Sequence, residues 1–130
     1  MVKLIELPSH LDPRGNLSVL EQDADVPFKI ERVHWIYDVP GGGERWGHAY
    51  RTNEEMIVAL SGSFDVIVSG PDGKETYRLD RSYLCLHVPA MTWRQLINFS
   101  TNAVALVLSS KPYDENDYIY EKHDMGLQAD

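Results

Sequence analysis

The sequence has one cysteine, no long apolar run and few basic residues, and each scarcity excludes a class of protein. Cys85 cannot form an internal disulfide, and its apolar neighbours predict a reduced, buried thiol. The 12 basic and 20 acidic residues give a formal net charge of −8, which disfavours nucleic acid as a partner. No run approaches the roughly 18 apolar residues of a membrane span, and the charged N-terminus lacks the apolar core of a signal peptide. We therefore expect no membrane association and a cytoplasmic protein.

The apolar residues occur in short runs that glycine, proline, asparagine and aspartate interrupt, which is typical of strands and turns. The length of 130 residues predicts one domain, residues 1–130. No helical stripe competes with the strands, so we expect an all-β sandwich or closed barrel. For the acidic, tyrosine-rich residues 113–130 we expect an extended arm or a short helix with a frayed end. The expected strands are Lys3–Leu7, Leu17–Glu21, Ile30–Asp38, Gly47–Tyr50, Glu55–Ser61, Ser63–Ser69, Glu75–Leu79, Tyr83–Val88, Trp93–Phe99 and Val104–Ser109.

Two stretches reproduce the spacing of the cupin signatures, which predicts a cupin-type jelly roll, also called a double-stranded β-helix. In the first signature a His-x-His pair and a later glutamate supply three metal ligands, and in the second a histidine supplies the fourth. Tyr50 stands at the place of the second histidine, and Arg94 at the place of the fourth ligand. The matching positions are Gly42, His48, Tyr50, Glu55 and Gly62, followed by Pro89, Met91, Arg94 and Asn98.

These two replacements favour a site without metal or other cofactor. The guanidinium of Arg94 has no free lone pair, and Tyr50 is a poor ligand while its hydroxyl is protonated. His48 and Glu55 alone are too few donors for a tight metal site. We therefore predict that no metal binds. Glu55 then becomes a buried partner of an arginine or a histidine, because an unpaired buried carboxylate is costly.

The remaining candidate functional groups in the interior of the predicted barrel are arginines and histidines. Three arginines, Arg14, Arg45 and Arg94, are candidates to receive a phosphorylated or otherwise anionic ligand. Alternate residues of a strand share a face, so His48 and Tyr50 point the same way. By the same rule, His34 shares a face with Ile36. Two imidazoles in one pocket suit proton transfer near neutral pH. For the tryptophans, Trp93 among them, both core packing and stacking on a ligand remain open.

Over nearly its whole length the sequence resembles the dTDP-4-keto-6-deoxyglucose 3,4-ketoisomerases, cupin enzymes of deoxyamino-sugar biosynthesis. The Arg-x-x-His-Ala block and the Tyr-Asp-Glu-x-Asp-Tyr-Ile tail are the most specific parts of the resemblance. The matching blocks are Asp12–Leu17, Val26–Val33, Arg45–Ala49, Ala59–Ser63, Val88–Pro89 with Trp93, Asn98–Ser100 and Tyr113–Ile119.

The resemblance implies a metal-independent isomerase that moves a proton between C3 and C4 of a dTDP-linked 4-keto sugar through an enediol. It implies that His48 is the base, with His34 or Tyr50 assisting, and that Arg14 and Arg45 contact substrate. His34, Tyr50 and Arg94 differ from the residues that are usual in the family. Arg94, Trp93 and Glu55 complete the expected substrate-binding set.

The resemblance also implies a homodimer that exchanges N-terminal strands, so Lys3–Leu7 is expected to pair with the other subunit. It implies a place in the synthesis of O-antigen (lipopolysaccharide) or another surface glycan. Two other functions stay open at this point. One is a non-catalytic cupin module that binds a sugar nucleotide or carbohydrate, and the other is a metal-dependent dioxygenase or epimerase.

Overall fold

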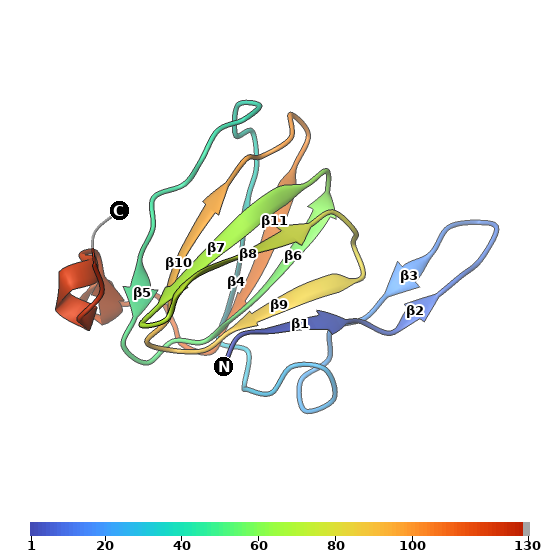
Figure 1. The fold of residues 1–130 in the computed structure, drawn as a ribbon. Coiled ribbons are helices and arrows are strands. Elements are labelled where there is room, and N and C mark those ends of the chain that lie inside the picture. Colours follow the sequence, from blue (N-terminus) through green and yellow to red (C-terminus); the bar gives the residue numbers. More distant parts are fainter. Residues whose placement is uncertain (129–130) are drawn as a thin grey trace.

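The computed structural model describes residues 1–128, in which antiparallel strands form two facing sheets (Figure 1). The larger sheet has the order β1-β9-β6-β11-β4, and the smaller has the order β10-β7-β8. In chain order these strands are β1 (Lys3–Glu6), β4 (Arg32–Ile36), β6 (Glu55–Ser61), β7 (Phe64–Gly70), β8 (Gly73–Leu79), β9 (Leu84–Val88), β10 (Trp93–Ile97) and β11 (Val104–Ser109). The predicted all-β, cupin-type jelly roll is confirmed.

Two small sheets lie outside this sandwich. The hairpin of β2 (Ser9–His10) and β3 (Leu17–Ser18) projects away from the rest of the molecule (Figure 1). At the other end, β5 (Ala49–Tyr50) pairs with β12 (Tyr118–Ile119). Along the chain, the 3-10 turn η1 (Glu115–Asp117) precedes β12 and the 3-10 turn η2 (Lys122–Met125) follows it. The tail of the chain thus returns to the segment that carries the cupin-like motif.

Strand β6 explains why the core is continuous. Its first five residues, Glu55–Ala59, are buried on both faces, which is why it reads as an apolar run rather than an alternating one. Ile57 packs between the sheets with Phe64 and Leu96. Met56 faces the other way, into a second cluster with Cys85. Burial raises the pKa of the Cys85 thiol to about 12, as expected for an unreactive packing residue.

The expected boundaries match best where burial is deepest. Strands β6 and β11 begin and end as expected, whereas β3 is only two residues long and β4 is shorter than Ile30–Asp38. The two-residue strands β2 and β12 were not expected, because so short a strand shows no alternation in sequence. The tail forms β12 and two short 3-10 helices, which agrees with the expected short helix. The frayed end concerns residues 129–130, which lie outside the described residues.

The expected exchange of the first strand is not seen in this structure. Strand β1 pairs with β9 of its own chain, from Lys3 opposite His87 to Glu6 opposite Leu84. The segment that leaves the body of the subunit is the β2–β3 hairpin that follows it. No helix within residues 1–128 is long and apolar enough to cross a membrane.

Candidate active site

A cavity of about 540 Å³ opens between β4, β5 and β10, and the tail closes one side of it. The structure brings all three expected catalytic side chains to its wall, together with two of the expected arginines. The lining residues are Arg32, His34, Ile36, Glu44, Arg45, Trp46, His48, Tyr50, Arg94 and Tyr118.

Strand alternation places the two histidines as expected. On β4, His34 and Ile36 face the cavity, whereas Trp35 between them is 59% exposed on the outer face. His48 is held by a pair of backbone hydrogen bonds with Arg94. The His48 amide donates to the Arg94 carbonyl at 3.0 Å, and the Arg94 amide donates to the His48 carbonyl at 2.9 Å. The imidazole of His48 therefore stands on a fixed backbone.

Gly47 is required next to His48. A Cβ atom built on Gly47 would lie 2.7 Å from Nε1 of Trp93, which is closer than a real Cβ contact. The missing side chain lets the indole of Trp93 pass directly against the backbone before His48. The prediction that Trp93 contacts substrate disagrees with this position. Its ring is buried among Ala49 and Ile119 and is not part of the cavity wall.

His48 carries a free nitrogen lone pair. Burial, and then the nearby charge of Arg94, lowers the pKa of His48 to about 4, while Glu55 acts in the opposite direction. The imidazole is therefore neutral at physiological pH. Its Nε2 is buried and has no hydrogen-bond partner among residues 1–128. A neutral, unpartnered nitrogen in a cavity wall has the properties of a general base.

His34 is a second neutral imidazole in the same cavity. Burial, followed by the charge of Arg32, lowers the pKa of His34. Its Nδ1 is also buried, and no described residue forms a hydrogen bond with it. The histidine pair expected from the sequence thus exists as two uncharged rings on different strands.

Arg94 and Glu55 form a buried ion pair beneath these rings. Nε of Arg94 donates to Oε1 of Glu55 at 2.8 Å, and Nη2 donates to Oε2 at 2.9 Å. Burial alone would raise the pKa of Glu55, but the adjoining guanidinium brings it below its ordinary value. The expectation that Glu55 binds substrate is therefore corrected, because both of its oxygens are engaged and it does not line the cavity.

The same pair explains why these residues do not fit a metal ion. Glu55, which matches a metal-ligand position, binds the guanidinium of Arg94 with its carboxylate. The positive charge of Arg94 therefore already occupies the place that a metal ion would need. Within residues 1–128, no three histidine, cysteine, aspartate or glutamate side chains gather in a metal-binding group. Arg94 itself does line the cavity, but as a neutralised cation.

Tyr50 and Tyr118 place two hydroxyl groups side by side in the wall. Oη of Tyr50 donates to Oη of Tyr118 at 3.4 Å, and both rings lie against His48, with centroids 5.0 and 5.2 Å from the imidazole. Burial, and then the charge of Glu55, raises the pKa of Tyr50 well above its ordinary value. Tyr50 is therefore a hydroxyl donor and not a phenolate.

Tyr118 was not expected in the site, although it belongs to the Tyr113–Ile119 block of the tail. Asp117 explains its position. The Asp117 carboxylate accepts hydrogen bonds from the amide and hydroxyl of Thr52, both at 2.9 Å, and from the amide of Asn53 at 3.0 Å. Arg51 donates to the Tyr118 carbonyl at 2.8 Å. These bonds fasten β12 to β5, with Tyr118 directly opposite Tyr50.

Two expected substrate contacts are found at the surface. Arg45 lines the mouth of the cavity, where its side chain is exposed beside Trp46. Arg14 does not reach the cavity within one chain. It lies on the β2–β3 hairpin, 90% exposed and paired with Asp12 at 2.8 Å. Figure 1 shows this hairpin at the far end of the molecule from β5.

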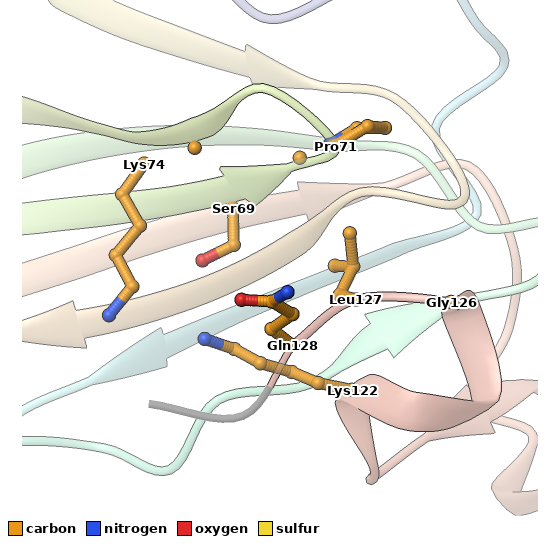
Figure 2. A pocket seen from close by; sticks show the side chains of 9 residues that line it. Ser69, Pro71, Lys74, Lys122, Gly126, Leu127 and Gln128 are labelled. Carbon is orange, nitrogen blue, oxygen red and sulfur yellow. The ribbon is translucent and has the colours of Figure 1, made fainter.

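A second cavity, of about 420 Å³, lies between the β7–β8 turn and η2 (Figure 2). Lys74 and Lys122 extend into it beside Ser69, whose buried hydroxyl has no hydrogen-bond partner in the described part of the chain. Among the residues that the structure describes, its wall contains no histidine or carboxylate that could accept a proton from carbon at neutral pH. The histidine-lined cavity is therefore the candidate active site.

Comparison with known proteins agrees with this geometry. The family model FdtA, described as WxcM-like, C-terminal, matches residues 1–127. The TDP-4-oxo-6-deoxy-α-D-glucose-3,4-oxoisomerase of Aneurinibacillus thermoaerophilus is 36% identical over 117 residues, which are 90% of this chain and 84% of that protein. The crystal structure of WlaRB, a TDP-quinovose 3,4-ketoisomerase from Campylobacter jejuni, superposes with a TM-score of 0.91 at 35% identity and covers 95% of both chains. QdtA, a sugar 3,4-ketoisomerase from Thermoanaerobacterium thermosaccharolyticum solved with TDP, gives a TM-score of 0.91 at 31% identity and covers 95% of this chain and 90% of its own.

Proposed function

Because this chain belongs to the FdtA family of WxcM-like, C-terminal domains, we propose that it is a TDP-sugar 3,4-ketoisomerase. Its substrate is a TDP-linked 4-keto-6-deoxyhexose, and its product is the corresponding 3-keto sugar. It acts in the cytoplasm as one domain, in deoxysugar synthesis for a surface glycan. Neither the reaction nor the residues in the cavity require a cofactor, because the transfer moves only protons between neighbouring atoms.

The free Nε2 of His48 is the observation that carries this proposal. It takes the proton from C3, whose acidity the neighbouring C4 carbonyl increases, and an enediolate forms. The imidazolium then delivers a proton to C4 as the carbonyl forms at C3. Arg45 at the cavity mouth binds the diphosphate, whereas Arg94 holds its charge against Glu55 and serves to anchor the backbone of His48.

The test is incubation of the protein with TDP-4-keto-6-deoxyglucose in deuterated water, followed by NMR. The proposal expects deuterium at C3 of recovered substrate and at C4 of the 3-keto product. Binding of the sugar nucleotide without any label at either carbon would instead identify a non-catalytic binding module. Label that appears only after addition of a divalent metal would favour a metal-dependent epimerase.

The lowered pKa of His48 predicts an unusual pH profile. A base must be unprotonated to act, and an ordinary histidine would lose activity about tenfold per pH unit below a pKa near 6.5. Because burial brings the pKa of His48 to about 4, kcat/KM should stay level from about pH 7 down to about pH 5 and fall only near pH 4. The measurement is kcat/KM against pH, with circular dichroism at each pH to confirm folding. An acid limb near pH 6.5 would contradict the assignment.

We also propose that two copies of this chain form a dimer, because the projecting β2–β3 hairpin needs further packing to be stable. A hairpin with two residues per strand is not stable in water without further packing. Its leucines Leu11 and Leu17 are 81% and 56% exposed. An apolar groove of about 560 Å³, with Leu7, Leu20 and Leu106 in its wall, lies at its base. A second copy of the chain covers these surfaces and gives Arg14 a route into the partner's cavity.

Mixing two impaired variants tests this arrangement. If Arg14 serves the cavity of the other subunit, co-expressed Arg14→Ala and His48→Asn chains form heterodimers with one complete site. Half of the dimers then carry one active site of two, so the mixture should recover about a quarter of the wild-type activity. Sedimentation should show a dimer. A monomer, or a mixture no more active than the Arg14→Ala protein at equal concentration, would overturn the proposal.

A further inference from the structure

Isomerisation requires a second proton transfer, between oxygens, that His48 does not perform. Removal of the C3 proton leaves an enediolate with a proton on O3 and a negative charge on O4. The 3-keto product needs the proton on O4 instead. Direct transfer between neighbouring oxygens of one sugar ring is strongly bent, and hydrogen bonds weaken steeply when the angle falls below about 120°. A relay outside the sugar ring provides straighter transfers.

We propose that Tyr118 and Tyr50 form this relay, an inference that rests on the proposed ketoisomerase function. Their hydroxyls are hydrogen-bonded to one another at 3.4 Å, and both side chains line the cavity that contains His48. Two adjacent hydroxyls can face two adjacent oxygens, since each can donate one proton and accept another. Tyr118 is thereby assigned a catalytic role that the sequence motifs alone did not indicate.

The transfers balance without a charged tyrosine accumulating. O4 takes the proton of Tyr118, Tyr118 takes the proton that Tyr50 donates to it, and Tyr50 takes the proton of O3. Three O–H bonds break and three form, and the enediolate charge moves from O4 to O3. The negatively charged O3 then forms the C3 carbonyl, and C4 takes the proton from His48. Concerted transfer matters here because burial strongly disfavours the phenolate form of Tyr50.

The position of Tyr118 is fixed from three directions, as a relay requires. Its backbone pairs with that of Tyr50 across β12 and β5. The Asp117 carboxylate and the Arg51 guanidinium clamp the residues on both sides of that pairing. On its outer side the ring stacks on Tyr120, with centroids 5.5 Å apart and planes 12° from parallel. Such support holds a hydroxyl within the narrow range that proton transfer demands.

Tyr118→Phe removes the hydroxyl and keeps the ring. We expect conversion to the 3-keto product to slow roughly 10²-fold, the scale of a lost proton-transfer group. Exchange of the C3 proton with deuterated water should continue within about threefold of the wild-type rate, because that step belongs to His48. NMR follows both rates in one sample. The split between conversion and exchange is the signature of a relay, since loss of packing would reduce both alike.

Matched variants decide between the relay and its alternatives. Tyr120→Phe removes a hydroxyl from the neighbouring ring, which is 60% exposed and does not line the cavity, and should leave both rates within about twofold of wild type. Tyr50→Phe should reproduce the split, and the double variant with Tyr118→Phe should be no worse than either single one, as for groups that act as a unit.

Three outcomes would overturn the relay. They are equal losses of exchange and conversion in Tyr118→Phe, no loss in either rate, and a split in His34→Asn that Tyr118→Phe does not show. The last would assign the oxygen proton to the imidazole on β4. Failure of the proposed function looks different, because the wild-type protein itself would then show neither exchange nor conversion.

Discussion

His48→Asn should reduce both C3 exchange and formation of the 3-keto product by roughly 10³-fold, within the range for loss of a general acid–base group. Asparagine keeps approximate size and polarity, but its amide does not accept a proton at neutral pH. The variant should still bind the sugar nucleotide, because the arginine at the cavity mouth is unchanged. The measurement is NMR of both carbons in deuterated water, with TDP affinity from calorimetry.

His123→Asn is the matched control for this loss. His123 is exposed in η2, and its Nε2 lies 3.2 Å from Oδ1 of Asp124. Its replacement should leave both rates unchanged. Retention of more than a tenth of wild-type exchange in His48→Asn would show that another group, with His34 the nearest candidate, takes the carbon proton. Loss of nucleotide binding together with exchange would instead indicate a disrupted cavity.

Arg94→Met should destabilise the fold by roughly 3–5 kcal/mol, the usual cost of breaking a buried ion pair by removing one partner. Glu55 would be left as a buried, uncompensated carboxylate, since Arg94 holds both of its oxygens. For a chain of this length the loss corresponds to a fall in Tm of roughly 10–20 °C. Calorimetry measures the change directly. The loss should become smaller as the pH falls, because without Arg94 burial raises the pKa of Glu55 and its protonation relieves the buried charge.

The double variant Glu55→Met/Arg94→Met separates the effect of charge from the effect of packing, and it is expected to stay folded. Removing both charges with side chains of similar volume should restore most of the lost stability, because no buried charge then remains. A double variant as unstable as Arg94→Met would show that packing, not charge, sets the cost. The surface pair of Lys29 and Glu31, 3.2 Å apart, provides a reference, and its removal should cost less than about 1 kcal/mol.

The sequence predicted the parts of the site that depend on strand alternation. His48, in the bridge that precedes β5, is separated from Tyr50 by one residue, as His34 is from Ile36 on β4, so each pair had to share a face. The fold followed from the same short, punctuated runs. The family resemblance named the reaction.

The parts that depend on long-range pairing were missed. Nothing in the spacing shows that Asp117 will bind the backbone at Thr52 and bring Tyr118 opposite Tyr50. The sequence predicted that Glu55 pairs with an arginine or a histidine, but not which one. The structure shows a two-point pairing with Arg94, which neutralises the charge of the guanidinium. For Trp93 the sequence left core packing and ligand stacking open, because an aromatic residue beside an active-site position is compatible with both, and its ring lies in a buried cluster.

The clamp at Asp117 also separates the cavity wall from the main core. The main core cluster draws all its members from residues before 108, so that cluster does not include the tail that Asp117 fastens. The wall that holds Tyr118 is added only when the tail folds back onto the loop at Thr52. A chain cut by a protease before Tyr113 is therefore expected to keep its main core cluster, while its histidine-lined cavity loses the wall that Tyr118 forms. The clamp thus makes activity sensitive to loss of the tail, although the main core cluster does not include it.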